Sequence, residues 1–202
     1  MKRIAVTSAL AFAACSPSGE PVAAAPEAPV AEAPPPSSTP AAGDTLTAEG
    51  FGPLKIGMTL AEVTAALGPD SDPDAVGGPD PESCDEFRPE RAPEGLLVMI
   101  QEGKLTRISL VELSDIKTDK GLGIGDAAAA IKTAYGADAK ATPHKYQDAP
   151  AEYVTWWQGG PRTEPYVEDE AARGIVYEID GTGKAGAIHA GGPSIQYVEG
   201  CA

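Results

Sequence analysis

The chain contains an internal duplication, and this constrains its fold more than any other feature of the sequence. Residues 57–68, GMTLAEVTAALG, align without a gap with residues 125–136, GDAAAAIKTAYG. Val63 then matches Ile131, and both runs begin and end with glycine. The sequence therefore predicts two copies of one small structural unit.

Each copy opens with a predicted helix. In the first copy Thr59 and Glu62 have the spacing of a capping box, and Gly68 followed by proline ends the helix. In the second copy we expect Asp126 to cap the helix and Gly136 to end it.

Each copy continues with residues of strand periodicity. Residues 95–111 predict a hairpin, and residues 174–190 predict the same hairpin with one more residue at the turn. Residues 153–157 and 194–198 predict further strands.

These elements define an α+β fold class. We expect two tandem helix-then-antiparallel-strand repeats, at about residues 50–115 and 116–202, within one domain at residues 45–202. A half of about 75 residues buries little core by itself, so the two repeats should share one sheet.

The N-terminal segment predicts export and lipidation. Two basic residues precede an uncharged run too short to cross a bilayer, so residues 1–14 predict a secretory signal peptide. The segment ends in AFAAC, which resembles the lipobox of bacterial lipoproteins and implies a diacylated Cys15. Cleavage near Ala13 with a free Cys15 thiol is the alternative. Residues 15–44, rich in proline and alanine, predict a disordered tether.

The charge balance limits the partners. A net charge of −15 repels phosphate backbones and anionic headgroups, so we expect no nucleic acid and membrane contact only through the lipid anchor. Ser16 after the cysteine resembles the pattern sorted to the outer membrane. The predicted location is the cell envelope, as an outer-membrane lipoprotein that faces the periplasm or the cell surface.

Residues 56–63, IGMTLAEV, resemble a helix opening found in two related groups of proteins. These are the β-lactamase-inhibitor-protein-like domains and the small lipoprotein subunit of the β-barrel assembly machinery. The duplication is similar to the inhibitor-like domains, and the lipid anchor and tether are similar to the assembly lipoprotein. The resemblance implies helices followed by antiparallel strands over about residues 50–200. It carries over no functional residue, because the shared motif contains only capping residues.

Two cysteines remain after lipidation, Cys84 and Cys201, one in each repeat. In an oxidising compartment they predict one disulfide. A pair of free thiols in an exchange reaction is the alternative, but the close C-x-x-C spacing of such thiols is absent.

Motifs for catalysis or metal binding are weak. Asp70, Asp72 and Asp74 alternate as in a calcium loop, but its sixth and twelfth positions lack the required glycine and glutamate. His144 and His189 have no partner at a ligand spacing, and no G-x-S-x-G elbow is present. We therefore expect no metal, no cofactor and no catalytic residue; an unrecognised hydrolase is the less favoured alternative.

The predicted working surface is the sheet face opposite the helices. Trp156 and Trp157 are adjacent on a strand and must point to opposite faces. Trp157 falls on the open face, which Leu97 and Glu178 share, and its composition is typical of a protein-binding surface. The alternatives are packing between the halves or under residues 159–172, and a structural outer-membrane assembly lipoprotein without a ligand site. The residues predicted to bind a protein or cell-envelope partner are Trp157, Tyr153, Met99, Arg107 and His189.

Overall fold

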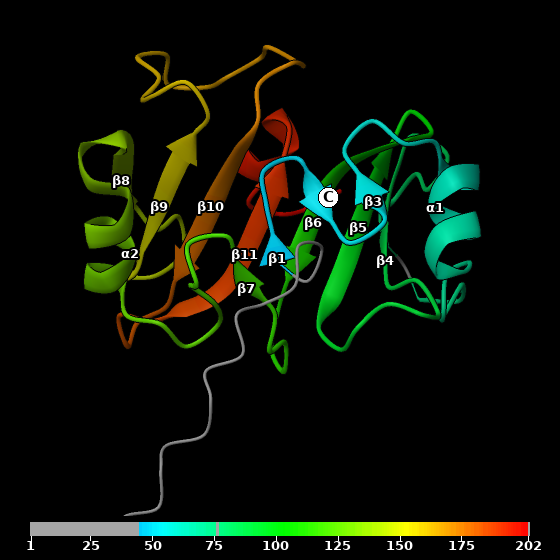
Figure 1. Ribbon diagram of the computed structural model, residues 1–202, viewed down its shortest axis with the longest axis horizontal. Coiled ribbons are helices and arrows are strands. Elements are labelled where there is room, and N and C mark those ends of the chain that lie inside the picture. The colour runs from blue at the N-terminus through cyan, green and yellow to red at the C-terminus, as the bar shows by residue number, and fades with distance from the viewer. Residues whose placement is uncertain (1–44, 76, 202) are drawn as a thin grey trace, which may run out of the picture. The chain divides into compact units, whose positions relative to one another are not determined.

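The computed structural model describes residues 45–75 and 77–201 (Figure 1). The predictions for the signal peptide, for lipidation of Cys15 and for the tether lie outside these residues. Among the described residues, no helix combines the length and the apolar character that a membrane crossing needs.

One seven-stranded antiparallel sheet forms the framework of the domain, in the order β4-β5-β6-β11-β10-β9-β8. The last hairpin strand of each half lies at its centre, where Leu110 of β6 pairs with Ile188 of β11. The predicted α+β class with an antiparallel sheet is therefore confirmed. The strands are β4 (Cys84–Phe87), β5 (Leu96–Gln101), β6 (Lys104–Leu110), β8 (Ala139–Pro143), β9 (Glu152–Trp157), β10 (Gly174–Ile179) and β11 (Ala185–Gly191).

Two helices of equal length pack near opposite ends of the sheet (Figure 1). Before the first helix, the Gly57 N–H donates to the Leu105 carbonyl over 2.8 Å. Before the second, the Gly125 N–H donates to the Ala185 carbonyl, also over 2.8 Å. The same contact thus attaches each helix to its own hairpin. The helices are α1 (Leu60–Leu67) and α2 (Ala128–Tyr135).

The remaining elements are short. They are the parallel pair β1 (Thr45–Leu46) and β7 (Lys117–Thr118), the antiparallel pair β2 (Gly50–Phe51) and β3 (Leu54–Lys55), and the 3₁₀ helices η1 (Gly136–Asp138) and η2 (Pro193–Gln196). The strand predicted at residues 194–198 is wrong, because η2 and the turn after it occupy this segment.

The two helices begin differently. The capping box of α1 is confirmed: the Glu62 N–H donates to the Thr59 hydroxyl, and the Thr59 N–H donates to the Glu62 carboxylate over 2.8 Å. The predicted cap of α2 is wrong. Ala127 occupies the N-cap position, and the Asp126 carboxylate instead accepts the Gly123 N–H over 2.7 Å. Asp126 lies one residue too early to reach the open N–H groups of the helix.

The main hydrophobic core lies between the helices and one face of the sheet. Val63 of α1 and Ile131 of α2 are fully buried in it. Trp156 packs against this core, with its ring 5.4 Å from that of Tyr135, whereas Trp157 belongs to a second cluster on the other face. The prediction that the two tryptophans point to opposite faces is confirmed.

The predicted disulfide between Cys84 and Cys201 is confirmed, with 5.5 Å between the two Cα atoms. It joins β4, at one edge of the sheet, to the end of the chain. The C-terminal segment, residues 192–201, is thereby held at the face that the helices leave uncovered.

The difference in capping predicts opposite effects of two substitutions. Thr59→Ala should lower the free energy of unfolding by about 1 kcal/mol, because α1 loses its side-chain cap. Ala127→Ser should raise it by up to about 1 kcal/mol, because residue 127 has the extended backbone of an N-cap and offers no acceptor. Urea denaturation measures both changes.

Ala129→Ser is the matched control, since residue 129 is exposed inside α2. It should cost about 0.5 kcal/mol through its lower helix propensity. A loss of stability in Ala127→Ser equal to that of the control would contradict the capping assignment.

Candidate functional site

A pocket lies on the sheet face that carries no helix. The strand registers place Lys140, Thr155, Val176 and His189 in one row across β8, β9, β10 and β11. The two middle residues have short side chains, whereas Tyr153, the next residue of β9 on this face, is large. Short side chains among long ones leave a hollow above the middle strands.

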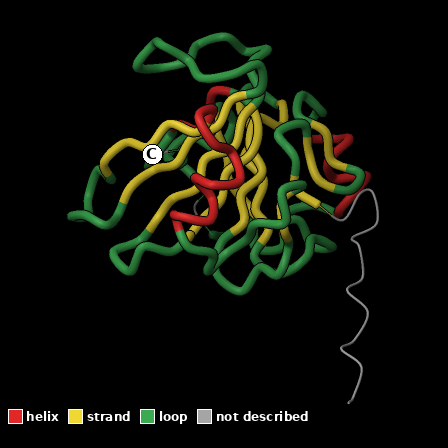
Figure 2. The backbone as a smooth tube through the Cα atoms, turned by 60° about the vertical axis from the view of Figure 1, so that its left-hand side comes forward, coloured by secondary structure: helices red, strands yellow, loops and turns green. Residues whose placement is uncertain are grey.

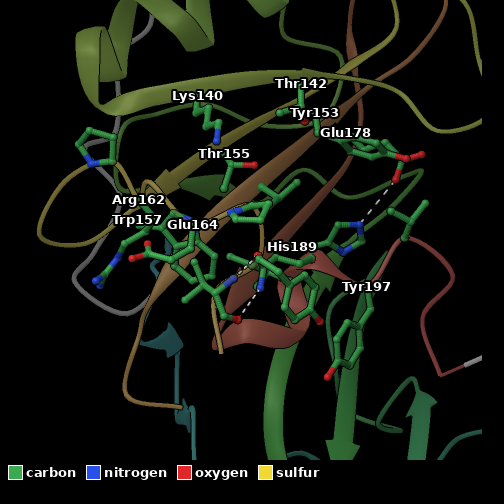
Figure 3. A pocket seen from close by; sticks show the side chains of 18 of the residues that line it. Lys140, Thr142, Tyr153, Thr155, Trp157, Arg162, Glu164, Glu178, His189 and Tyr197 are labelled. Carbon is green, nitrogen blue, oxygen red and sulfur yellow. Dashed lines mark hydrogen bonds and ion pairs between the residues drawn. The ribbon is translucent and has the colours of Figure 1, made fainter. Parts of the chain in front are cut away.

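Two segments enclose this hollow (Figure 3). The connection between β9 and β10, residues 158–173, projects beyond the strand ends and contributes residues 161, 162 and 164–167 (Figures 1 and 2). The C-terminal segment contributes residues 195–198. The resulting pocket has a volume of about 220 Å³.

The exposure predicted for this face is wrong for three residues. Trp157 is only 5% exposed, Arg107 2% and Met99 0%. Val167 and Ile195 belong to the same buried cluster as Trp157, so the β9–β10 connection and η2 cover its ring. Trp157 therefore packs under residues 159–172, as the alternative prediction for this face expected.

The five residues predicted to bind a partner separate into two groups. Tyr153, Trp157 and His189 line the pocket. Arg107 and Met99 are buried elsewhere on the same face and are not among the lining residues. Contact of the first group with a partner stays a prediction.

Arg107 fastens the C-terminal segment to the sheet. Its Nη2 donates to Glu86 over 2.8 Å, and its Nη1 donates to the carbonyls of Ser194, at 3.2 Å, and Tyr197, at 2.9 Å. The side chain is 3% exposed, so these bonds form away from water. A planar guanidinium with several fixed donors suits this combination of carboxylate and carbonyl acceptors. It sets the position of Tyr197, which lines the pocket.

Glu178 of β10 is the most perturbed acid in the pocket. Its Oε2 lies 3.8 Å from His189 Nε2, and its Oε1 lies 3.0 Å from His144 Nε2. The two imidazoles, His189 first, lower the pKa of Glu178 to about 2 against the opposing effect of burial. The carboxylate is therefore ionised at any physiological pH.

His144 holds its imidazole in one orientation. Its Nδ1 accepts the backbone N–H groups of Tyr146, at 3.0 Å, and Gln147, at 3.1 Å. Since Nδ1 acts as an acceptor, the ring proton lies on Nε2 and is donated to Glu178. Tyr153 stacks on this ring with 4.7 Å between centroids.

His189 connects the pocket to a buried hydroxyl. Its Nδ1 lies 2.9 Å from Ser109 Oγ, and burial lowers the pKa of His189. Ser109, His189 and Glu178 thus follow the order of a nucleophile, base and acid. Ser109, however, is 1% exposed and is not among the pocket residues, so its hydroxyl does not face the cavity. Ser109 thus orients the His189 ring, whose other nitrogen lies 3.8 Å from Glu178.

The described residues contain no group of three or more His, Cys, Asp or Glu side chains that could hold a metal ion. The alternating acids of the 70–74 loop form local turn contacts, since the Asp72 N–H donates to the Asp70 carboxylate over 3.0 Å.

No protein-family model, no curated protein and no solved structure matches this chain. The geometry of the pocket is therefore the basis for its functional interpretation.

Sequence reasoning missed the contact between His144 and Glu178 and the pocket walls at Tyr166 and Tyr197. Strand alternation places Glu178 on the correct face. His144, however, lies in the loop after β8, 34 residues before Glu178 in the sequence, and alternation does not predict their contact. The stacked rings of Tyr166 and Tyr197, 6.4 Å apart, belong to segments without periodicity. No sequence signal connects them.

The buried position of Arg107 predicts a large loss on substitution. Arg107→Met should lower the free energy of unfolding by about 3 kcal/mol, because Glu86 loses its cation in a partly buried site and two carbonyls of the C-terminal segment lose their donor. Urea denaturation measures the loss. Arg88→Met, at an exposed position one residue beyond β4, is the control and should cost less than about 0.5 kcal/mol. Similar small losses in both variants would show that the ion pair contributes nothing to the fold.

The perturbed acid and base predict a specific loss of stability in acid. His189 has a folded pKa below its ordinary value of 6.5, so stability is fully present above pH 6.5 and falls as the pH drops towards the lowered pKa. Glu178 has a folded pKa of about 2 against 4.5, so its contribution is lost between pH 4.5 and 2. Both changes destabilise the protein on acidification.

His189→Asn removes the upper window and shrinks the lower one, because His189 is also the first cause of the lowered pKa of Glu178. Denaturation at a series of pH values should give a flatter stability curve for the variant as the pH falls below 6.5. Parallel curves for variant and parent in that range would refute the role of His189.

Proposed function

We propose that this domain is a non-enzymatic binding module, and that the pocket on its helix-free face receives part of a protein or cell-envelope partner. The observation that carries this proposal is the chemistry of the lining: four aromatic rings line the same pocket as an ionised carboxylate. Aromatic anchors dominate binding hot spots, and ligand sites combine apolar walls with few placed polar groups. The rings belong to Tyr153, Trp157, Tyr166 and Tyr197.

The size of the pocket limits what enters it. Its volume of about 220 Å³ is below the range of roughly 300–1,000 Å³ that is usual for drug-sized ligands. It suits one side chain or one small headgroup of a larger partner. The partner would therefore cover the pocket mouth and insert a single group.

Anchoring and ancestry complete the proposal. We place the chain in the cell envelope, as an outer-membrane lipoprotein acylated at Cys15, and we take its halves as tandem repeats of the inhibitor-like unit. The matching contacts of Gly57 and Gly125 support a duplication. The Cys84–Cys201 disulfide suits an oxidising compartment.

A structural role in an outer-membrane assembly is the second candidate. It is favoured by the burial of Met99, Arg107 and Trp157, which removes much of the expected open surface. In that case the C-terminal segment would serve only to stabilise the sheet, and neighbours would contact several faces of the domain.

Site-specific photo-crosslinking in intact cells distinguishes the two. A photoreactive residue at Thr142, which lines the pocket and is exposed, should capture one discrete partner. The same residue at Ala134, on the exposed side of α2, is the control and should not capture that partner. Equal capture from both positions would favour the structural role, and no capture from Thr142 would contradict the binding proposal.

A further inference from the structure

We propose that the pocket binds an organic cation, an ammonium or guanidinium group held against the Glu178 carboxylate and the surrounding aromatic rings. This inference rests on the proposed binding function and names the chemistry of the group that enters the pocket.

The first support is the hydrogen-bonding state of Glu178. Oε1 accepts the His144 Nε2–H, but Oε2 lies 3.8 Å from His189 Nε2, which is too long for a hydrogen bond. The side chain is 29% exposed and lines the pocket. An acceptor on a half-buried carboxylate is therefore open to a donor from the cavity.

The second support is the set of hydrogen bonds and charges around this carboxylate. His144 accepts two backbone N–H groups at Nδ1 and uses Nε2 for its single hydrogen bond to Glu178 Oε1, so it leaves Oε2 without a partner. Burial, with the nearby Arg107 cation, keeps the pKa of His189 below its ordinary value. Glu178 thus keeps its full negative charge in a partly desolvated site, where a charge-assisted hydrogen bond is strongest.

The third support is the balance of the other charges. Asp138 and Glu164 are offset by Lys140 and Arg162, so the charged lining residues sum to the single negative charge of Glu178. Figure 3 shows Lys140, Arg162 and Glu164 on one side of the pocket and Glu178 on the other. The negative end of the pocket is therefore separate from its basic residues. A monovalent cation matches this end, and an anion does not.

The fourth support is the aromatic wall. Tyr153 is the cross-strand neighbour of Glu178, and the stacked Tyr166 and Tyr197 rings complete the lining. Aromatic faces attract organic cations, and the attraction increases when water is excluded. The net charge of −15 on the chain would also draw cations towards the site. A carboxylate among aromatic rings selects a cation over a neutral group of the same shape.

Two sources share this chemistry: a free amine or guanidine, and a Lys or Arg side chain of a protein partner. Isothermal titration of the purified full chain can separate them with methylguanidine, a terminally blocked Ala-Arg-Ala peptide and the neutral isostere Ala-citrulline-Ala. We expect the arginine peptide to bind at least tenfold more tightly than the citrulline peptide. A peptide preferred over methylguanidine indicates a protein partner, and the reverse indicates a small molecule.

Glu178→Gln is the decisive variant, because the amide keeps an oxygen for His144 and removes the charge. It should weaken binding of the cationic probes at least tenfold, whereas Glu170→Gln, in the exposed β9–β10 connection, should change it less than twofold. Thermal melting checks that each variant is folded. If Glu178→Gln is unfolded, the comparison of the arginine and citrulline peptides on the parent chain still shows whether the pocket prefers a cation.

Equal binding of arginine and citrulline peptides, unchanged binding in folded Glu178→Gln, or no binding of any cationic probe would overturn the inference. The proposed function would survive such a result if crosslinking from Thr142 still captured a discrete partner. It would fail together with the inference if that crosslink were also absent.

Discussion

The buried guanidinium of Arg107 is the contact on which the helix-free face of this domain depends. It binds Glu86 on the edge strand β4 and two carbonyls of the C-terminal segment, and the disulfide at Cys201 closes the same segment a few residues later. Burial of Ile195 beside Trp157 holds the start of this segment, and the Arg107 bonds and the disulfide hold the rest. Because Arg107 and the disulfide fix its path, Tyr197 becomes a wall of the pocket instead of part of a free end.

The pocket itself follows from side-chain size within a regular sheet. Thr155 and Val176 are short and adjacent across two strands, and larger residues surround them. His144 holds Glu178 in one orientation through a hydrogen bond to Oε1, and Ser109 orients the neighbouring His189 ring. The polar residues of this face thus serve two separate purposes. Arg107 and Glu86 attach the C-terminal segment to the sheet, and Glu178 lines the pocket that we propose as the cation site.

The sequence predicts the framework better than the site. The capping box at Thr59 and the alternation of strand residues act locally, so α1 and the faces of Trp156 and Trp157 could be predicted. The alternation of strand residues assigns each side chain to one face of the sheet, but it does not show which other segments cover that face. Trp157 is buried by the β9–β10 connection and by η2, and Arg107 meets the C-terminal segment 87 and 90 positions away. Neither contact could be predicted, because the loop and the C-terminal segment that make them have no periodic pattern of apolar residues.

The hollow on the helix-free face is the site that we propose for a cationic group. Chemical-shift mapping of the ¹⁵N-labelled full chain, during titration with the blocked arginine peptide, locates the bound group along the chain. We expect the largest shifts on the amides of Tyr153, Glu178 and residues 195–198, with α1 and α2 unchanged. Shifts centred on the helices, or spread evenly over the acidic surface, would contradict it.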